Sequence, residues 1–431
     1  MRRLIYEQLL GWKNNPNRKP LILNGARQTG KTWLLKEFGS KEYKKLAYIN
    51  CDESPEIKNA FTDYKTDRLI RFFSVLSNTV IEPENTLIVL DEVQTAPNAL
   101  TALKYFCEDA GEYHIAVAGS LLGIGLHEGT GFPVGKVDEI NLYPLSYTEF
   151  LLAMGQEQLV NFMSEQRFEE TAQLEATFID YLRQYYYVGG MPAVVRDYVE
   201  KQDFKAVRDI QNQILSDYRR DFSKHIPSDL LPKINLVWDS LPAQLAKENK
   251  KFIYGMIKKG SRAKEFENAI QWLMDAGLVY KVKRVTKVEK PLKFYEDHSS
   301  FKLFMLDMGL LGAMSDVSAK DVLVNNTAFT EYKGAFTEQF VLQELVGLNK
   351  QLYYYSKENS TLELDFLLQK EELYPIEVKA EENLKSKSLR TVYENDNRLQ
   401  PIRFSMAGYK EQDWIINVPL YLVQSWANTL S

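Results

Sequence analysis

The residues best suited to chemistry lie in one short stretch near the N-terminus. Gly25, Gly30, Lys31 and Thr32 stand at the spacing G-x-x-x-x-G-K-T, directly after the apolar residues 21–24. Glycines allow backbone N–H groups to converge on an anion, the start of a helix adds its dipole, and a lysine reaches the terminal phosphates. The pattern predicts a nucleoside triphosphate site, and ATP is the expected cofactor.

Nine consecutive residues are expected to surround the bound nucleotide. Lys31 would reach the β- and γ-phosphates, and the Thr32 hydroxyl would ligate Mg²⁺. An accidental match in an ordinary loop is the alternative, and the apolar run directly before the loop argues against it. The expected contact residues are Gly25, Ala26, Arg27, Gln28, Thr29, Gly30, Lys31, Thr32 and Trp33.

A second apolar run, residues 86–90, ends in the neighbouring carboxylates Asp91 and Glu92. A buried strand that brings an acid to its carboxyl-terminal edge is suited to hold Mg²⁺ close to a phosphate. We expect Asp91 to hold the metal through water and Glu92 to be the base that polarises the attacking water. A strand that simply meets solvent at its end is the alternative, and the phosphate loop upstream favours the catalytic interpretation.

The composition is that of an ordinary globular protein. Hydrophobic residues make up 45% of the 431 residues and charged residues 26%, and the net charge is -5. No global basic field indicates a nucleic-acid binder, so any such binding would depend on local patches. Cys51 and Cys107 lack the spacing of a disulfide framework or a thiolate zinc site. Without an apolar signal-peptide core or a membrane-length apolar run, the sequence favours a cytoplasmic protein.

The length favours two to four domains, and the pattern of the chain predicts an α/β protein in four parts. Residues 1–146 are expected to form a P-loop core, and residues 147–227 a helical lid because helical periodicity continues there without strand-like alternation. Three helical segments followed by two strand-like runs predict a winged helix-turn-helix over residues 228–324. Residues 325–431 alternate strands and helices, which predicts a second α/β domain.

Positive charge concentrates on the expected wing of the winged helix. Such charge favours phosphate contacts, and the third helix of this fold can enter a major groove. Glu265 and Glu267 on that helix would instead repel phosphate, so a plain packing module is the alternative. The cations of the expected wing are Lys281, Lys283, Arg284, Lys287, Lys290 and Lys293.

The C-terminal part holds a second group of residues suited to metal chemistry. Asp365 lies in one expected strand, while Glu377 and Lys379 lie two residues apart in the next and project to the same face. Asp365 and Glu377 could hold Mg²⁺, and Lys379 could orient or deprotonate the water that attacks a phosphodiester. This segment resembles the restriction-endonuclease-like fold with its PD-(D/E)xK site, although no proline stands beside Asp365. The resemblance implies a further metal ligand, Glu338, and a domain that only binds DNA is the alternative to a nuclease.

Motifs along nearly the whole chain resemble the bacterial and archaeal AAA+-like ATPase family whose C-terminal half is the domain of unknown function numbered 4143. The similarity implies a P-loop ATPase core with a helical lid, then a winged helix, then a restriction-endonuclease-like α/β domain. The segments that carry the similarity are residues 25–32, 90–94, 118–120, 142–150, 188–192, 217–224 and 272–278.

The resemblance also implies roles that the residues alone do not assign. In AAA+ ATPases a polar residue after the next strand senses the γ-phosphate, and Ser120 is the candidate for it. Such ATPases assemble as oligomers, in which an arginine from a neighbouring subunit stabilises charge on the γ-phosphate. The possible donors remain open, and they are Arg196, Arg219, Arg220 and Lys136.

Together these features predict an ATP-hydrolysing, Mg²⁺-dependent homo-oligomer that acts on DNA, in particular branched or broken DNA. The C-terminal domain would bind DNA or cleave it with Mg²⁺. A nucleotide-dependent signalling or assembly switch is the alternative. In that alternative the C-terminal half binds a protein partner, which the acidic net charge favours.

Overall fold

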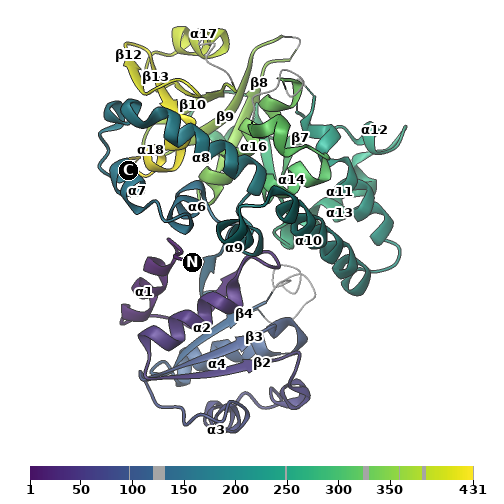
Figure 1. Ribbon diagram of the computed structural model, residues 1–431. Helices are drawn as coiled ribbons and strands as arrows, with labels where there is room; N and C mark the ends of the chain where they lie inside the picture. The colour runs from purple at the N-terminus through teal and green to yellow at the C-terminus, as the bar shows by residue number, and fades with distance from the viewer. Residues whose placement is uncertain are drawn as a thin grey trace. The chain divides into compact units, whose positions relative to one another are not determined.

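The computed structural model divides the chain into two compact units, whose elements are drawn in Figure 1. The smaller unit holds residues 2–143 and 272–278, and the larger unit holds Met1 with residues 144–271 and 279–431. The division after residue 143 lies close to the predicted end of the P-loop core at residue 146. The residues that the structure describes are 1–96, 98–119, 132–247, 250–323, 330–358, 360–380 and 385–430.

The smaller unit is built around a five-stranded parallel sheet. Its strands are β1 (Leu21–Asn24), β2 (Lys45–Asn50), β3 (Thr86–Asp91), β4 (His114–Ala118) and β5 (Asp138–Asn141). They lie in the order β2-β3-β4-β1-β5. Every residue of β3 and β4 is buried, which explains the apolar runs at residues 87–90 and 115–118. All strands end at the same edge, so the residues that follow β1 and β3 lie there together.

Helices cover both faces of this sheet. They are α1 (Tyr6–Asn14), α2 (Lys31–Glu42), α3 (Thr66–Leu76) and α4 (Ala99–Asp109). On one face the rings of Phe73 in α3 and Phe106 in α4 stack 6.2 Å apart, in the cluster that holds Ile88. Phe38 of α2 belongs to the cluster on the other face, with Leu87. The neighbours Leu87 and Ile88 thus serve opposite faces, as the two-residue period of a strand requires.

The larger unit begins with the helical region that the sequence predicts. A capping box starts its first helix, because the Ser146 hydroxyl accepts the Glu149 N–H while the Glu149 carboxylate accepts the Ser146 N–H. The first five helices are α6 (Tyr147–Ala153), α7 (Glu157–Ser164), α8 (Glu175–Val188), α9 (Pro192–Lys201) and α10 (Phe204–His225). The three expected helices of the winged helix follow as α11 (Leu231–Leu245), α12 (Tyr254–Ile257) and α13 (Ala263–Asp275).

An eight-stranded mixed sheet forms the rest of the larger unit. Its strands are β6 (Val279–Val285), β7 (Glu296–Met305), β8 (Leu352–Ser356), β9 (Glu363–Gln369), β10 (Leu373–Val378), β11 (Ile402–Ser405), β12 (Lys410–Gln412) and β13 (Ile415–Pro419). Their order is β12-β13-β11-β10-β9-β8-β6-β7. The accompanying helices are α14 (Met308–Met314), α15 (Ala319–Leu323), α16 (Thr330–Val346), α17 (Lys387–Asn395) and α18 (Val423–Ala427).

This sheet crosses the predicted boundary between residues 324 and 325. The expected wing, β6 and β7, continues the sheet of the expected nuclease-like domain, because β6 pairs in parallel with β8. The register places Lys283 opposite Tyr353 and Val285 opposite Tyr355. A parallel pair needs a long crossover connection, which β7 and the helices α14 to α16 supply. Winged-helix and nuclease-like segments therefore share one sheet in place of two separate domains.

Buried polar contacts connect α16 to the helical region of the larger unit. The Glu344 carboxylate accepts the N–H of Tyr147 at 2.8 Å, and Gln343 donates to the Tyr185 hydroxyl at 2.8 Å. Burial raises the pKa of Glu344 to about 8, although the Tyr147 N–H opposes the shift. The carboxyl group is therefore protonated in the folded protein at pH values where the unfolded chain would ionise it.

A pH-dependent term in stability follows from Glu344. Between its ordinary pKa of 4.5 and about 8, the folded state holds a proton that the unfolded state releases. This group therefore lowers the free energy of unfolding as pH rises, by up to about 1.4 kcal/mol per pH unit. Glu344→Gln keeps the acceptor oxygen but cannot ionise. In urea unfolding between pH 5 and 8, we expect its free energy of unfolding to rise relative to that of wild type as the pH increases. Exposed Glu371→Gln is the control, and parallel curves for Glu344→Gln and wild type would contradict the assignment.

The Gly189-Gly190 pair allows a close approach of three backbone segments. Gly189 has a φ of +72°, and a Cβ on Gly190 would lie 2.1 Å from the carbonyl oxygen of Leu145. The Gly190 N–H donates to the buried Asp307 carboxylate at 2.6 Å, and Asp307 also accepts the N–H of Leu310 at 3.0 Å. The carboxylate thus caps α14 while it holds the turn after α8.

Gly190→Ala is expected to destabilise the larger unit by about 3 kcal/mol, because the added methyl group must displace backbone. Gly255→Ala in α12 is the matched control, since its nearest atom would be the Ile253 side chain at 4.0 Å. Chemical denaturation of both variants measures the difference. Equal unfolding midpoints for the two would show that the turn is not constrained as described.

Candidate functional site

The phosphate loop connects β1 to α2 at the carboxyl edge of the parallel sheet. Gly25 and Gly30 have φ values of +152° and +95°, and a Cβ on Gly25 would lie 2.4 Å from the Leu142 carbonyl oxygen. The Thr29 hydroxyl donates to the Ala26 carbonyl at 2.8 Å within the loop. Helix α2 then begins directly after Gly30, so its first N–H groups are available to an anion.

Lys31 is buried against its own loop. Its ammonium donates to the carbonyl oxygens of Gly25 at 2.7 Å and Ala26 at 2.8 Å. Burial lowers the pKa of Lys31 to about 8, although the carboxylates of Glu92 and Asp91 oppose the shift. A phosphate in the loop would supply the anionic partner that the two carbonyls replace only in part.

Asp91 is held by two neutral hydroxyl groups. Its Oδ2 accepts hydrogen bonds from Thr32 at 2.6 Å and from Tyr48 at 2.9 Å. Only 3% of Asp91 is exposed. Burial, followed by the Asp91 charge, raises the pKa of Tyr48, so this hydroxyl stays protonated and remains a donor. The structure thus brings Thr32 and Asp91 together as the sequence predicts, and it adds Tyr48.

Tyr48 was not predicted as a site residue because it belongs to no motif. Its position follows from the parallel register of β2 and β3, which places Tyr48 opposite Val89 and Asn50 opposite Asp91. The Lys36 ammonium lies 3.7 Å from the centroid of the Tyr48 ring. Strand pairing was the signal that could have identified Tyr48.

Glu92 is held in a left-handed conformation, with a φ of 49°. The Gln94 amide donates to Glu92 Oε2 at 2.6 Å, so Gln94 sets the direction of this carboxylate. Gln94 ends the motif at residues 90–94, but the motif assigned it no role. A strained backbone at a polar site is characteristic of functional positions.

The N-terminal arm also supports the phosphate loop. Arg3 is 6% exposed and donates from Nη1 to the Thr29 carbonyl at 3.1 Å and from Nη2 to the Tyr143 carbonyl at 2.6 Å. It therefore joins the loop to the chain that follows β5. The Met-Arg-Arg start of the sequence gave no spacing from which to infer this contact.

The remaining predicted residues of the ATP site differ in exposure and in their ion-pair partners. Trp33 is 43% exposed, and Ser120 lies outside the described residues. Among the possible arginine-finger residues, Lys136 pairs with Glu108 at 2.9 Å, and Arg219 pairs with Asp239 at 2.5 Å. Arg220 pairs with Asp217 at 3.3 Å, and Arg196 is exposed on α9. Exposed pairs of this kind contribute under about 1 kcal/mol and exchange readily, so the finger stays a prediction.

In the larger unit, the structure brings Asp365 and Glu338 together. β9 and β10 are antiparallel with Phe366 opposite Ile376, so Asp365 and Glu377 occupy the next positions on the other face of the sheet. The Val378 N–H donates to Asp365 Oδ2 at 2.7 Å, and the Asp365 and Glu338 carboxyl groups are close enough to shift each other's pKa. Burial raises the pKa of Asp365 to about 8, and the neighbouring Glu338 charge adds to the increase.

Buried lysines, which the sequence analysis did not consider, lie at these carboxylates. Glu338 accepts from Lys250 at 2.5 Å and lies 3.6 Å from the Lys302 ammonium. Lys302 has no exposed surface and also lies 2.7 Å from Glu363. Burial alone would lower the pKa of Lys302, yet the Glu338 and Glu363 carboxylates raise it above its ordinary value. Lys302 is therefore a buried, charged ammonium group.

The predicted metal set Glu338, Asp365 and Glu377 does not form a ligand cluster. Glu377 pairs instead with Lys379 at 2.7 Å, so the Lys379 ammonium is engaged by the chain itself. No group of three or more His, Cys, Asp or Glu side chains within the described ranges could hold a metal ion. The physical reason is that one oxygen of Glu338 and one of Glu377 already contact a lysine, while Asp365 accepts a backbone N–H.

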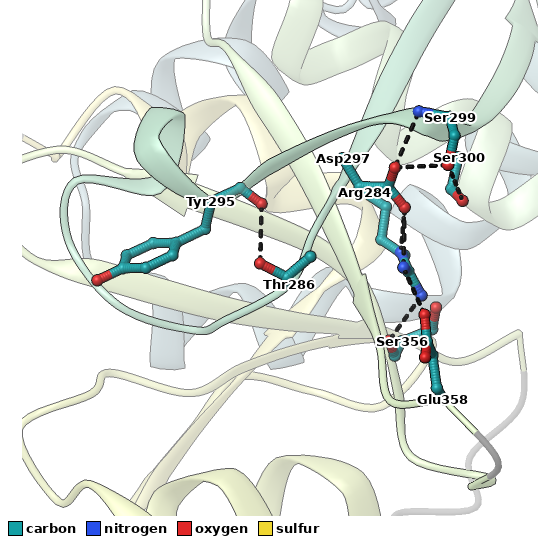
Figure 2. Close-up of polar contacts among 8 residues, drawn as sticks. All are labelled: Arg284, Thr286, Tyr295, Asp297, Ser299, Ser300, Ser356 and Glu358. Carbon is teal, nitrogen blue, oxygen red and sulfur yellow. Dashed lines mark hydrogen bonds and ion pairs between the residues drawn. The ribbon is translucent and has the colours of Figure 1, made fainter.

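Half of the six cations of the expected wing have an ion-pair partner among the described contacts, namely Lys283, Arg284 and Lys290. Figure 2 shows Arg284 between two carboxylates, Asp297 at 2.8 Å and Glu358 at 3.1 Å. Asp297 additionally accepts the N–H of Ser299 at 2.8 Å and its hydroxyl at 2.7 Å (Figure 2). Lys283 pairs with Glu296 at 2.6 Å. The positive patch predicted for the wing is thus neutralised in part.

Exposed positive charge also lies in the turn between α12 and α13 and at the start of α13. The charge of this turn was not predicted, because the turn belongs neither to the expected wing nor to the acidic residues of α13. The segment KKGSRAK was the available signal. Its exposed cations are Lys258, Lys259, Arg262 and Lys264.

Comparison with protein families accounts for both units. Residues 17–151 match the family described as AAA domain, and residues 333–421 match the Domain of unknown function (DUF4143). The chain is an AAA+-like P-loop ATPase with a C-terminal DUF4143 domain. A further family, Domain of unknown function (DUF8612), matches residues 179–321 of this ATPase. The family resemblance expected from the motifs is confirmed.

Solved structures share only a distant likeness with the ATPase. Aeropyrum pernix ORC2, in ADPNP-ADP complexes, is 13% identical with a TM-score of 0.34, and the match covers 75% of this chain and 92% of that chain. AMPPCP-bound DnaA from Aquifex aeolicus is 15% identical with a TM-score of 0.31, covering 63% and 88%. Aeropyrum pernix ORC1 in complex with DNA is 14% identical with a TM-score of 0.27, covering 73% and 90%. Likeness at this level assigns no ligand or partner.

No curated protein matches the ATPase. Within the part of the chain that the structure describes, no helix is long and apolar enough to cross a membrane.

Tyr48→Phe is expected to slow ATP turnover about 5-fold, because one hydrogen bond of roughly 1 kcal/mol to Asp91 is lost. Tyr64→Phe is the matched control in the same unit, since the Tyr64 ring stacks on Tyr105. Steady-state release of phosphate at saturating ATP measures the effect. Wild-type turnover in Tyr48→Phe would show that the hydroxyl does not position Asp91.

Proposed function

We propose that this ATPase uses Mg²⁺ with ATP and that its hydrolysis cycle acts on DNA, in particular branched or broken DNA, as a homo-oligomer. The observation that carries the nucleotide part is the contact between Thr32 and Asp91. The DNA part is supported by the exposed basic turn between α12 and α13.

The residues at the phosphate loop fit a magnesium ion. Thr32 and Asp91 supply hard oxygen atoms only 2.6 Å apart, and Asp91 has no cation of its own chain at hydrogen-bond distance among the described contacts. In this proposal Thr32 ligates Mg²⁺ directly and Asp91 holds it through water. Mg²⁺ supplies neutralisation of phosphate charge when bound.

The other residues of the loop then have separate roles. Lys31 exchanges the carbonyls of Gly25 and Ala26 for β- and γ-phosphate oxygens, which are stronger acceptors. Glu92, directed by Gln94, polarises the attacking water. Ser120 remains the proposed sensor of the γ-phosphate, and the arginine finger remains unassigned.

DNA contact is proposed for the turn before α13. In a helix-turn-helix, the start of the last helix faces the groove and flanking cations contact phosphates. Lys258 and Lys259 are exposed in that turn, and Arg262 precedes the helix. On the wing, Lys287 and Lys293 are exposed, so they would add phosphate contacts. DNA cleavage is not part of the proposal, because the carboxylates of the C-terminal domain are engaged by lysines.

Fluorescence anisotropy with duplex, single-stranded and branched DNA tests the DNA proposal. Binding is measured at salt concentrations of about 50 and about 200 mM. Lys258→Glu with Lys259→Glu should weaken all three substrates alike and reduce the salt slope by about 2, because phosphate contacts carry no sequence information. Exposed Lys41→Glu with Lys44→Glu is the charge-matched control. Absence of binding to every substrate, together with no stimulation of ATP hydrolysis by DNA, would refute the proposal.

A nucleotide-controlled assembly switch is the second candidate. The internal pairing of Lys283 and Arg284 favours it, because two of the wing cations are then less available to phosphates. Glu92→Gln, which should trap the ATP-bound state, separates the candidates in affinity purification. Recovery of a stoichiometric protein partner without DNA would support the switch, and recovery of DNA would support the first proposal.

A further inference from the structure

We infer that the carboxylate centre of the larger unit, formed by Glu338, Glu363, Asp365 and Glu377, is neutralised by the protein's own lysines in place of a divalent metal. Lys302 and Lys250 are the two buried cations that occupy it. The inference concerns the C-terminal half of the ATPase and does not rest on the proposed DNA function.

Lys302 bridges three elements of the larger unit. It lies on β7, and its ammonium is 2.7 Å from Glu363 on β9 and 3.6 Å from Glu338 on α16. The ammonium also lies 4.9 Å from the centroid of the Tyr354 ring on β8. Because the side chain has no exposed surface, it cannot leave this position without rearranging the core.

Lys250 completes the neutralisation of Glu338. It is 7% exposed and donates to Glu338 Oε1 at 2.5 Å. Both oxygens of Glu338 therefore face an ammonium group. A divalent ion would have to displace a buried lysine, and a buried charge that loses its partner is strongly unfavourable.

The other two carboxylates are also satisfied from within the chain. Asp365 accepts the Val378 N–H at 2.7 Å, and Glu377 pairs with Lys379 at 2.7 Å. Glu377 Oε2 is buried without a hydrogen bond among the described contacts, but Arg403 lies opposite Glu377 in the register of β10 and β11. The charge of Arg403 acts on Glu377, so this oxygen too lies near a cation.

The arrangement has a consequence for the role of the domain. Magnesium-dependent hydrolysis of a phosphodiester needs carboxylate oxygens that are free to hold the ion. Here the same oxygens join α16 to the strands through Lys302. The centre is a structural ion-pair network in a nuclease-like fold, and its carboxylates do not support metal-dependent cleavage.

Mn²⁺ binding to the full chain without nucleotide tests the inference, with free Mn²⁺ measured by electron paramagnetic resonance. Wild type and Asp365→Asn should bind the same amount of Mn²⁺. Asp91→Asn shows how much of the bound Mn²⁺ belongs to the phosphate loop. One Mn²⁺ per chain that Asp365→Asn loses and Asp91→Asn retains would overturn the inference.

If lysines take the place of a metal ion, removing a lysine charge should make the stability of the larger unit depend on a divalent metal. We expect Lys302→Met to lower the unfolding midpoint by roughly 5–15 °C, since it leaves Glu338 and Glu363 buried without this partner. Added Mn²⁺ should then raise the midpoint of the variant more than that of wild type. An equal or smaller rise of the midpoint in the variant would contradict the inference that Lys302 takes the place of a metal ion.

Lys250→Met serves as the second variant if Lys302→Met does not fold, with the same expected response to Mn²⁺. Lys320→Met, at an exposed lysine, is the control. The comparison of wild type with Asp365→Asn needs neither lysine variant and decides the inference by itself.

Discussion

The contact of buried Lys302 with Glu338 and Glu363 is the interaction on which the larger unit depends. It joins an end strand of the sheet to α16 and to β9, elements that are far apart in the sequence. An ammonium without exposure is stable only with anionic partners, and buried carboxylates likewise require a cation or donors. The same contact therefore holds the sheet against its helix and determines which chemistry the carboxylates can support.

The two units treat buried carboxylates in opposite ways. Asp91 is held by the neutral hydroxyls of Thr32 and Tyr48, which fix its position without cancelling its charge. Its negative charge is thus left for a metal ion beside the phosphates. Glu338, in contrast, faces Lys250 and Lys302 and has no uncompensated charge to offer. Buried carboxylates thus form part of an ATP site in the smaller unit and of a structural ion-pair network in the larger unit.

Local patterns predict much of this architecture. The phosphate loop, the strand that ends at Asp91 and the proximity of Glu338 to Asp365 follow from motifs and periodicity, because each depends on residues close in sequence or on a known fold. Tyr48 and Lys302 do not, since their roles depend on strand register and on packing between distant segments. The continuous sheet was not predicted for the same reason. The paired strands β6 and β8 are separated by a long crossover connection.

Anomalous scattering from crystals grown with Mn²⁺ and a non-hydrolysable ATP analogue tests the contrast between the two units most directly. The account predicts one manganese peak beside Thr32 and Asp91, with the Lys302 ammonium still in contact with Glu363. A manganese peak between Asp365 and Glu377, with Lys302 displaced from Glu338, would contradict it.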